Sequence, residues 1–169
     1  MADTLARADV PAAHRWDHAD LFPDLDAWDA AYDATFARLD EIRAFEGTLG
    51  RGPERLAAWL RVSEEVERDL GRLRVWAAMA SSVDTGDEPA RERADRLTAL
   101  RSAVDEAAAF ATPELVAIGV DTLRAWTSDP ALADRERWLQ RLERDAPHVR
   151  SPEIEALLGA LGTPFAGAA

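Results

Sequence analysis

The chain has 169 residues, of which 47% are hydrophobic and 31% charged, and its formal net charge is −12. A single domain of this length buries roughly 68–70% of its unfolded surface, so the composition predicts a globular protein and excludes a disordered one. The acidic balance argues against nucleic acids and membranes as partners, because phosphate groups and anionic lipids are bound by clustered basic residues.

The absence of cysteine narrows the chemistry further. Disulfide bonds, a thiolate nucleophile and a cysteine-ligated zinc site are excluded. Residues 1–10 lack the apolar core of a signal peptide, and no window approaches 18 uninterrupted apolar residues. We therefore expect a cytoplasmic protein.

The first 23 residues are expected to be irregular, because Pro11 and Pro23 bracket a segment without a clean apolar period. Three large residues there are candidates for packing on a core: Trp16, Leu21 and Phe22.

A first helix is predicted from residue 24 to about Glu46, with Asp24 or Asp26 as its N-cap. Apolar residues recur along it at steps of three and four, as on one face of a helix. They are Trp28, Tyr32, Phe36, Leu39 and Ile42. Gly47 is typical of the position that ends a helix.

A long antiparallel hairpin is predicted from residues 53–83 and 88–110. Pro53 suits a first helical turn, residues 84–88 form a polar break, and Pro89 opens the second helix. The first helix carries a seam of alternating three- and four-residue steps: Leu56, Trp59, Ser63, Val66, Leu70, Leu73, Ala77 and Ala80. The second carries a matching stripe: Ala90, Ala94, Leu97, Leu100, Val104 and Ala107.

Shorter helices are predicted beyond Pro113, over residues 113–118, 121–127, 130–144 and 151–161. Prolines 130, 147 and 152 separate them. The expected fold is therefore an all-α antiparallel bundle with one long hairpin and several short C-terminal helices. Its expected divisions are an irregular segment 1–23, a helical domain 24–161 and a tail 162–169.

His14 and His18 have the spacing of a zinc-peptidase helix, H-E-x-x-H, but the glutamate that must follow the first histidine is Arg15 here. Two histidines alone also fall short of the three protein ligands of a catalytic zinc site. Chance spacing on a surface segment is therefore favoured over zinc catalysis.

Other short motifs also have simpler explanations. Asp84-Thr85-Gly86 spells the aspartic-protease triplet, but it occurs once and between helices, which favours a turn. Asp24 and Asp26 do not form a calcium loop, because the required glycine position is Asp29.

No phosphate loop or catalytic triad can be assigned either. The glycines at 47, 50 and 52 are not followed by Gly-Lys-Ser/Thr, and His148 has no marking context. We therefore assign no catalytic, cofactor-binding or metal-binding residue. Core packing is favoured over ligand stacking for the tryptophans, among them Trp28, Trp59, Trp126 and Trp138.

Several short phrases follow one another in a set order along the chain. The opening phrases are Trp16-Asp17, Asp20-Leu21-Phe22-Pro23, and then Trp28 and Tyr32. The middle ones are Leu70-Gly71-Arg72-Leu73, Val75-Trp76-Ala77 and Asp84-Thr85, followed by Phe110 with Pro113-Glu114-Leu115. The last are Leu139, Leu142 and Arg144, Pro147-His148 with Ser151-Pro152, then Glu155 and Leu158. The order of these phrases resembles that of oligoendopeptidase F-type zinc peptidases, and His18 and Arg150 depart from the pattern.

The resemblance implies an N-terminal, non-catalytic domain that forms the wall and lid of a peptide channel. In that family the opposite wall carries H-E-x-x-H and a later glutamate, which hold zinc. This chain contains neither motif, so the resemblance implies zinc only for an absent catalytic domain, and oligopeptides as substrates only of the complete enzyme. His148 matches a family position that is not a ligand.

Two hypotheses of different classes follow. The first is a separated N-terminal channel domain, either a fragment or a truncated product. The alternative is a stand-alone helical scaffold or interaction module. An independent hydrolase using His14 and His18 is a remote third. Residues 73–80 are apolar nearly all round, with Val75, Trp76 and Met79 widening the seam. We expect this face to meet the missing catalytic domain or a second copy of the chain.

Overall fold

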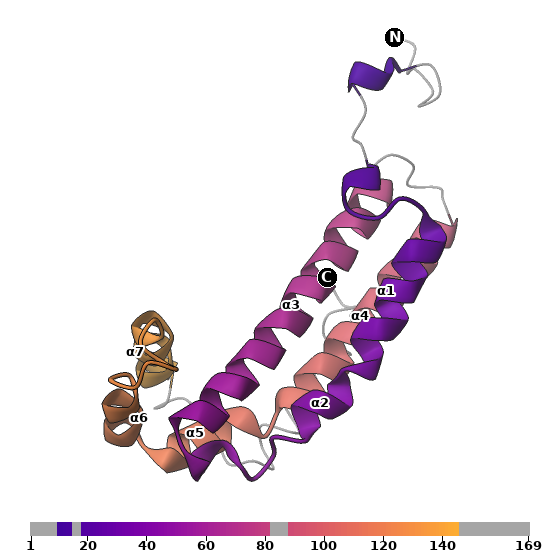
Figure 1. Cartoon of the computed structure of the whole chain (residues 1–169). Helices are drawn as coiled ribbons and strands as arrows, with labels where there is room; N and C mark the ends of the chain where they lie inside the picture. Colours follow the sequence, from indigo (N-terminus) through magenta and orange to yellow (C-terminus); the bar gives the residue numbers. More distant parts are fainter. Residues whose placement is uncertain (1–9, 15–17, 82–87, 146–169) are drawn as a thin grey trace.

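The computed structural model describes residues 10–14, 18–81 and 88–145, and every regular element in those ranges is a helix (Figure 1). The α-helices are α1 Leu25–Ala37, α2 Leu39–Arg43, α3 Pro53–Ser81, α4 Glu88–Ala108, α5 Ala111–Ile118, α6 Val120–Trp126 and α7 Glu136–Asp145. Short 3-10 turns are η2 Ala12–His14, η3 His18–Asp20 and η4 Leu49–Arg51. The predicted all-α fold is confirmed. None of these helices is long and apolar enough to cross a membrane.

The α3–α4 hairpin is the longest feature of the molecule, and α1 and α2 lie along it (Figure 1). Its two helices are antiparallel, because Glu67 pairs with Arg101 while Trp76, further along α3, lies beneath Arg93. The helix bounds agree with the predicted hairpin to within two residues. The connection over residues 82–87 lies outside the described ranges.

The predicted seam of α3 faces the interior as expected. Six of its members are buried, Ser63 is half-buried and the side chain of Ala80 is not described. The six are Leu56, Trp59, Val66, Leu70, Leu73 and Ala77. The alternation of three- and four-residue steps therefore predicted the buried face of this helix correctly.

The single helix predicted over residues 24–46 is instead two helices with a break at Arg38. Asp24 is the N-cap, because its Oδ1 accepts a hydrogen bond from the Ala27 N–H at 2.8 Å. At the break the chain turns from α3, on which α1 packs, toward α4, on which α2 packs. The turn shifts the buried face, so Thr35 is buried and Phe36 is half exposed, which corrects the predicted stripe. Gly47 follows the turn that succeeds α2.

Arginine side chains link α1 and α2 to the hairpin. Arg38 bonds Glu65 at 2.7 Å, and this hydrogen bond raises the pKa of Arg38 above its usual value. Arg96 of α4 pairs with Asp29 at 2.5 Å and lies over the ring of Tyr32 at 4.3 Å. All four ion-pair partners are partly exposed, so these contacts orient the helices more than they stabilise them.

The stripe of α4 also needs one correction. Ala94 is exposed, and Arg93 takes the inward position, 9% exposed, with its guanidinium 5.8 Å from the ring centroid of Trp76. The four other described members are buried as predicted: Leu97, Leu100, Val104 and Ala107. A long arginine stem can occupy a core-facing position when its charged end meets an aromatic face.

The first core lies between α1, α2, α4 and the C-terminal part of α3, and includes Phe22. At its centre Trp28 stacks between Tyr32 and Trp76, with ring centroids 5.7 and 6.1 Å away. Both indole N–H groups donate to backbone carbonyls, Trp28 to Leu73 at 3.1 Å and Trp76 to Phe22 at 3.3 Å. Leu21 and Phe22 thus pack on the core as predicted, and Trp16 lies outside the described residues.

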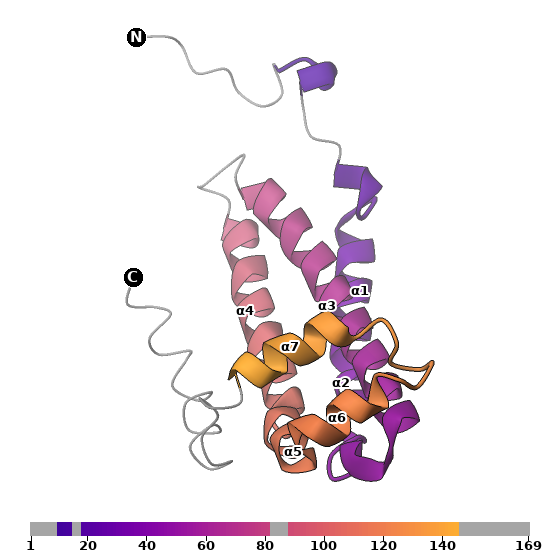
Figure 2. The same cartoon turned by 90° about the vertical axis from the view of Figure 1, so that its left-hand side faces the viewer.

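The second core lies between the N-terminal part of α3 and α5 to α7. The α7 helix lies across the side of α3 (Figure 2), and Arg135, just before α7, pairs with Glu64 of α3. The helix predicted over residues 130–144 starts only at Glu136. Residues 130–134 form turns instead, because the Asp129 carboxylate accepts the Ala131 N–H at 2.8 Å while Leu132 is buried. The predicted helix 151–161 lies outside the described residues.

Candidate functional site

The sequence motifs that resemble catalytic or metal-binding motifs do not come together into a site in the described part of the chain. His14 is exposed at the end of η2, and His18 begins η3. Within residues 10–14, 18–81 and 88–145, no three histidine, aspartate or glutamate side chains could together hold a metal ion. Of the two acids considered for a calcium loop, Asp24 caps α1, and Asp29, at the position where the loop would need glycine, pairs with Arg96. Asp84-Thr85-Gly86 and His148 lie outside these ranges.

The five tryptophans among the described residues divide into two groups. Trp28, Trp59 and Trp76 are buried in the two cores, which confirms the packing role predicted for Trp28 and Trp59. Trp126 and Trp138 are only half-buried, although both pack against the second core. Trp126 therefore keeps part of its indole available for contact with another molecule.

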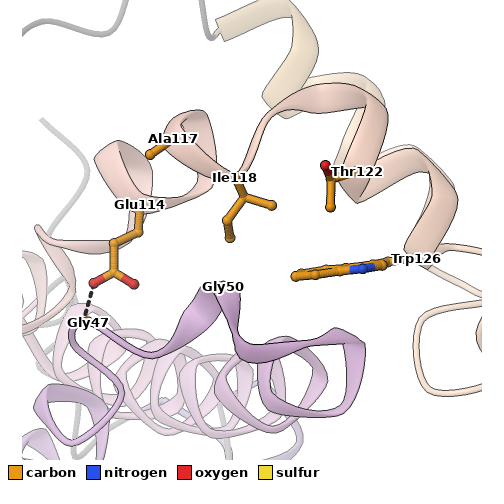
Figure 3. Close-up of a pocket in the computed structure, with 7 residues that line it drawn as sticks. All are labelled: Gly47, Gly50, Glu114, Ala117, Ile118, Thr122 and Trp126. Carbon is orange, nitrogen blue, oxygen red and sulfur yellow. Dashed lines mark hydrogen bonds between the residues drawn. The ribbon is translucent and has the colours of Figure 1, made fainter.

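A hollow of about 440 Å³ lies beside Trp126, where α5 and α6 face the turn before α3 (Figure 3). Seven residues line it: Gly47, Gly50, Glu114, Ala117, Ile118, Thr122 and Trp126. Figure 3 shows Glu114 and Trp126 at opposite ends, with Ile118 between them and Gly50 below. The hollow thus combines an apolar wall, an indole and one carboxylate.

Glu114 holds the two sides of the hollow together. Its carboxylate accepts the backbone N–H of Gly47 at 2.5 Å and that of Leu49 at 3.2 Å. Gly47 has a φ of +70°, a left-handed conformation that favours glycine, and it turns the chain into η4. One side chain of α5 therefore fixes a turn that lies 65–67 residues earlier in the sequence.

We expect Glu114→Ala to lower the free energy of unfolding by about 1–3 kcal/mol, because two backbone donors lose their acceptor. Urea denaturation followed by circular dichroism measures the change. Glu106→Ala is the matched control, since Glu106 is an exposed residue of α4 and the same charge is removed. Equal destabilisation by the two substitutions would show that the Glu114 contacts contribute nothing.

Four large apolar side chains remain exposed elsewhere on the described surface. Leu25 and Phe36 lie on α1, Val75 on α3 and Val116 on α5, with exposed fractions of 40–50%. Within the predicted apolar face of residues 73–80, Trp76 and Ala77 are buried, Met79 is half-buried and Val75 faces solvent. This chain thus covers only part of that face.

Sequence reasoning did not find the hollow. The sequence excludes a phosphate loop at Gly47 and Gly50 and predicts core packing for Trp126. The available signal was the Pro113-Glu114-Leu115 phrase, in which Leu115 is buried and Glu114 makes the turn contacts. A long-range contact between an exposed turn and a short helix leaves no periodic trace in the sequence.

Comparison with known proteins gives consistent matches. The family model described as Oligopeptidase F matches residues 114–169. Oligopeptidase PepF of Bacillus subtilis (strain 168) is 28% identical over 153 residues, which are 90% of this chain and 23% of that protein. The plasmid-encoded oligoendopeptidase F of Lactococcus lactis subsp. cremoris is 24% identical over 161 residues, 94% of this chain and 27% of that protein. The chain thus spans about a quarter of the length of these relatives.

Two crystal structures share the fold. Oligoendopeptidase-F from Enterococcus faecium superposes with a TM-score of 0.75 at 24% identity, covering 84% of this chain and 28% of that one. A putative peptidase from Chlamydophila abortus gives a TM-score of 0.74 at 22% identity, covering 94% of this chain and 27% of that one. At these identities the likeness describes the helical arrangement alone.

Proposed function

We propose that this chain, which matches the N-terminal part of oligoendopeptidase F-type peptidases in sequence and in fold, works as the substrate-channel domain of an oligopeptide-cleaving zinc metalloendopeptidase. The observation that carries the proposal is the extent of the match. It runs through 90% of this chain and only 23% of the Bacillus subtilis protein, as expected for one domain of a larger enzyme.

In this proposal the chain shapes the channel and does no chemistry itself. The H-E-x-x-H motif does not occur in its sequence, and the two N-terminal histidines lack the glutamate between them. The residues of the described part do not fit a zinc ion, so no catalytic step is assigned to them. The cytoplasmic location expected from the sequence is part of the same proposal.

We expect the purified chain to be inactive on a quenched fluorescent nonapeptide, with or without added zinc, because it has no complete zinc site. The matched control carries His14→Ala and His18→Ala together. Turnover that a chelator abolishes, and that exceeds this control, would contradict a non-catalytic role.

A chimera tests the channel role. The segment of the Bacillus subtilis protein that matches this chain is deleted in one variant and replaced by this chain in another. We expect the deletion to lose most of kcat/KM on the nonapeptide and the chimera to recover it. Zinc content and circular dichroism establish that both variants are folded. An unimpaired deletion variant, or a folded and zinc-loaded chimera as inactive as the deletion, would contradict the proposal.

The alternative is a helical scaffold or interaction module, in which exposed apolar side chains such as Val75 and Phe36 would contact a partner. In the channel proposal the partner is a catalytic domain, and in the scaffold proposal it is a second copy of the chain or another protein. An H-E-x-x-H segment encoded downstream of Ala169 would favour the first. Concentration-dependent dimerisation in sedimentation equilibrium, with no such segment, would favour the second.

A further inference from the structure

The outward face of α7 carries an arginine row. Arg137, Arg141 and Arg144 follow one another at steps of four and three residues and are all exposed, while Leu139 of the same helix is buried in the second core. No ion pair joins any of the three to another described residue. Like charges at these spacings repel one another on a helix, so the row destabilises α7 unless an anionic group covers it.

The electrostatics of a single helix do not account for the whole arginine row. The helix dipole favours a cation near the C-terminus, which explains Arg144. Arg137 lies in the first turn of α7, where the same dipole disfavours a cation. Three acids in α7 offset the arginines in number, so the outward face is basic because of the arginine spacing. The row is also opposite in sign to the chain, whose net charge is −12.

The outward face of α1 carries an acidic row, Asp26 and Asp33. Both are exposed, on the side of the helix opposite the buried Trp28. Neither forms an ion pair with another described residue, whereas Asp29 of the same helix pairs with Arg96. The remainder of this face consists of small exposed side chains: Ala30, Ala34 and Ala37.

The two rows match in length. Seven residues separate Asp26 from Asp33 and also Arg137 from Arg144, which is about 10.5 Å in either helix at 1.5 Å per residue. When the two helices lie side by side, each terminal arginine can stand opposite one aspartate. Arg141 then lies over the small alanine side chains, which leave room for its stem of methylene groups.

The two rows of one chain cannot meet each other. The α1 helix packs on the first core and α7 on the second, and they lie on opposite sides of α3 (Figures 1 and 2). A contact between the arginine row and the acidic row therefore requires two chains.

We propose that the arginine row of α7 binds the acidic row of α1 in a second copy of this chain. The contact joins two different surfaces, so each pair keeps one free row of each kind and can extend into longer assemblies. Exposed ion pairs are weak and two acidic chains repel, so we expect a dissociation constant on the order of 0.1–1 mM. The proposal goes beyond the channel role and does not depend on it.

Two variants that each lack one half of the contact provide the test. Asp26→Asn with Asp33→Asn removes the acidic row, and Arg137→Gln, Arg141→Gln and Arg144→Gln together remove the arginine row. Sedimentation equilibrium, over concentrations that span the expected dissociation constant, measures association. We expect the unaltered chain to associate and each variant alone to associate at least about fivefold more weakly. An equimolar mixture should recover association as one-to-one pairs only, because one variant supplies α7 and the other supplies α1.

Glu92→Gln with Glu106→Gln is the matched control, since it removes the same two negative charges from exposed positions of α4. It should associate like the unaltered chain, and thermal melts establish that all variants are folded. The proposal is overturned by an unaltered chain that stays monomeric, by row variants that associate as tightly as the control, or by a mixture no more associated than its components. An inactive chimera would remove the channel role and leave this result unchanged.

Discussion

Leu70→Asp is expected to unfold most of the domain or to lower its melting temperature by about 10–20 °C. Leu70 lies on α3 in the first core and is only 5% exposed. A carboxylate buried there without a partner costs several kcal/mol, about half of the 5–15 kcal/mol that stabilises a typical domain. For a chain of this size, each kcal/mol corresponds to roughly 2–4 °C in melting temperature.

Val75→Asp is the matched control for this substitution. It introduces the same charge into the same helix, at a side chain that is 46% exposed. We expect its effect to stay within about 0.5 kcal/mol, as for most surface substitutions. Circular dichroism melts of the two variants decide the matter, and similar melting temperatures would contradict the placement of the α3 seam in the core.

Trp28→Ala is expected to destabilise the domain by about 3–5 kcal/mol, the usual cost of removing a buried aromatic side chain. Trp28 has no exposed surface, and its ring stacks on both Tyr32 and Trp76. Trp28→Phe keeps an aromatic ring but removes the indole N–H that donates to the Leu73 carbonyl. We expect that variant to lose about 1–2 kcal/mol.

Urea denaturation curves measure both losses. Phe36→Ala is the control, because Phe36 lies on the same helix and is half exposed. Its expected loss is below about 1 kcal/mol. If the three variants unfolded at the same urea concentration, Trp28 would not be the centre of the first core.

Periodicity predicted the long elements well, because their buried faces repeat over many turns. The seam of α3 and the stripe from Leu97 to Ala107 are both buried as expected. The errors lie where tertiary contacts override the local pattern. The helix over residues 24–46 breaks at Arg38, and its guanidinium reaches Glu65 and Asp69 of α3. No residue within that segment signals the break, since neither glycine nor proline is present.

On α4, side-chain polarity and residue spacing predict different inward-facing residues. Ala94 was expected inside because it is apolar, yet Arg93 continues the alternation of three and four residues that passes through Leu97 and Leu100. The spacing predicts the buried position correctly, and the methylene groups of the Arg93 side chain make the apolar contacts there. The hollow could not be predicted in the same way, since it depends on Glu114 meeting a turn near residue 47.

The continuity of α3 has a consequence for how the domain loses its structure. The same helix supplies Leu56 to the second core and Leu73 to the first, while Val62 and Phe110 pack against both. Opening either core would therefore expose part of the other, and the two regions should unfold as one cooperative unit. Native-state hydrogen exchange should then give the central amides of α3 the same protection as global unfolding.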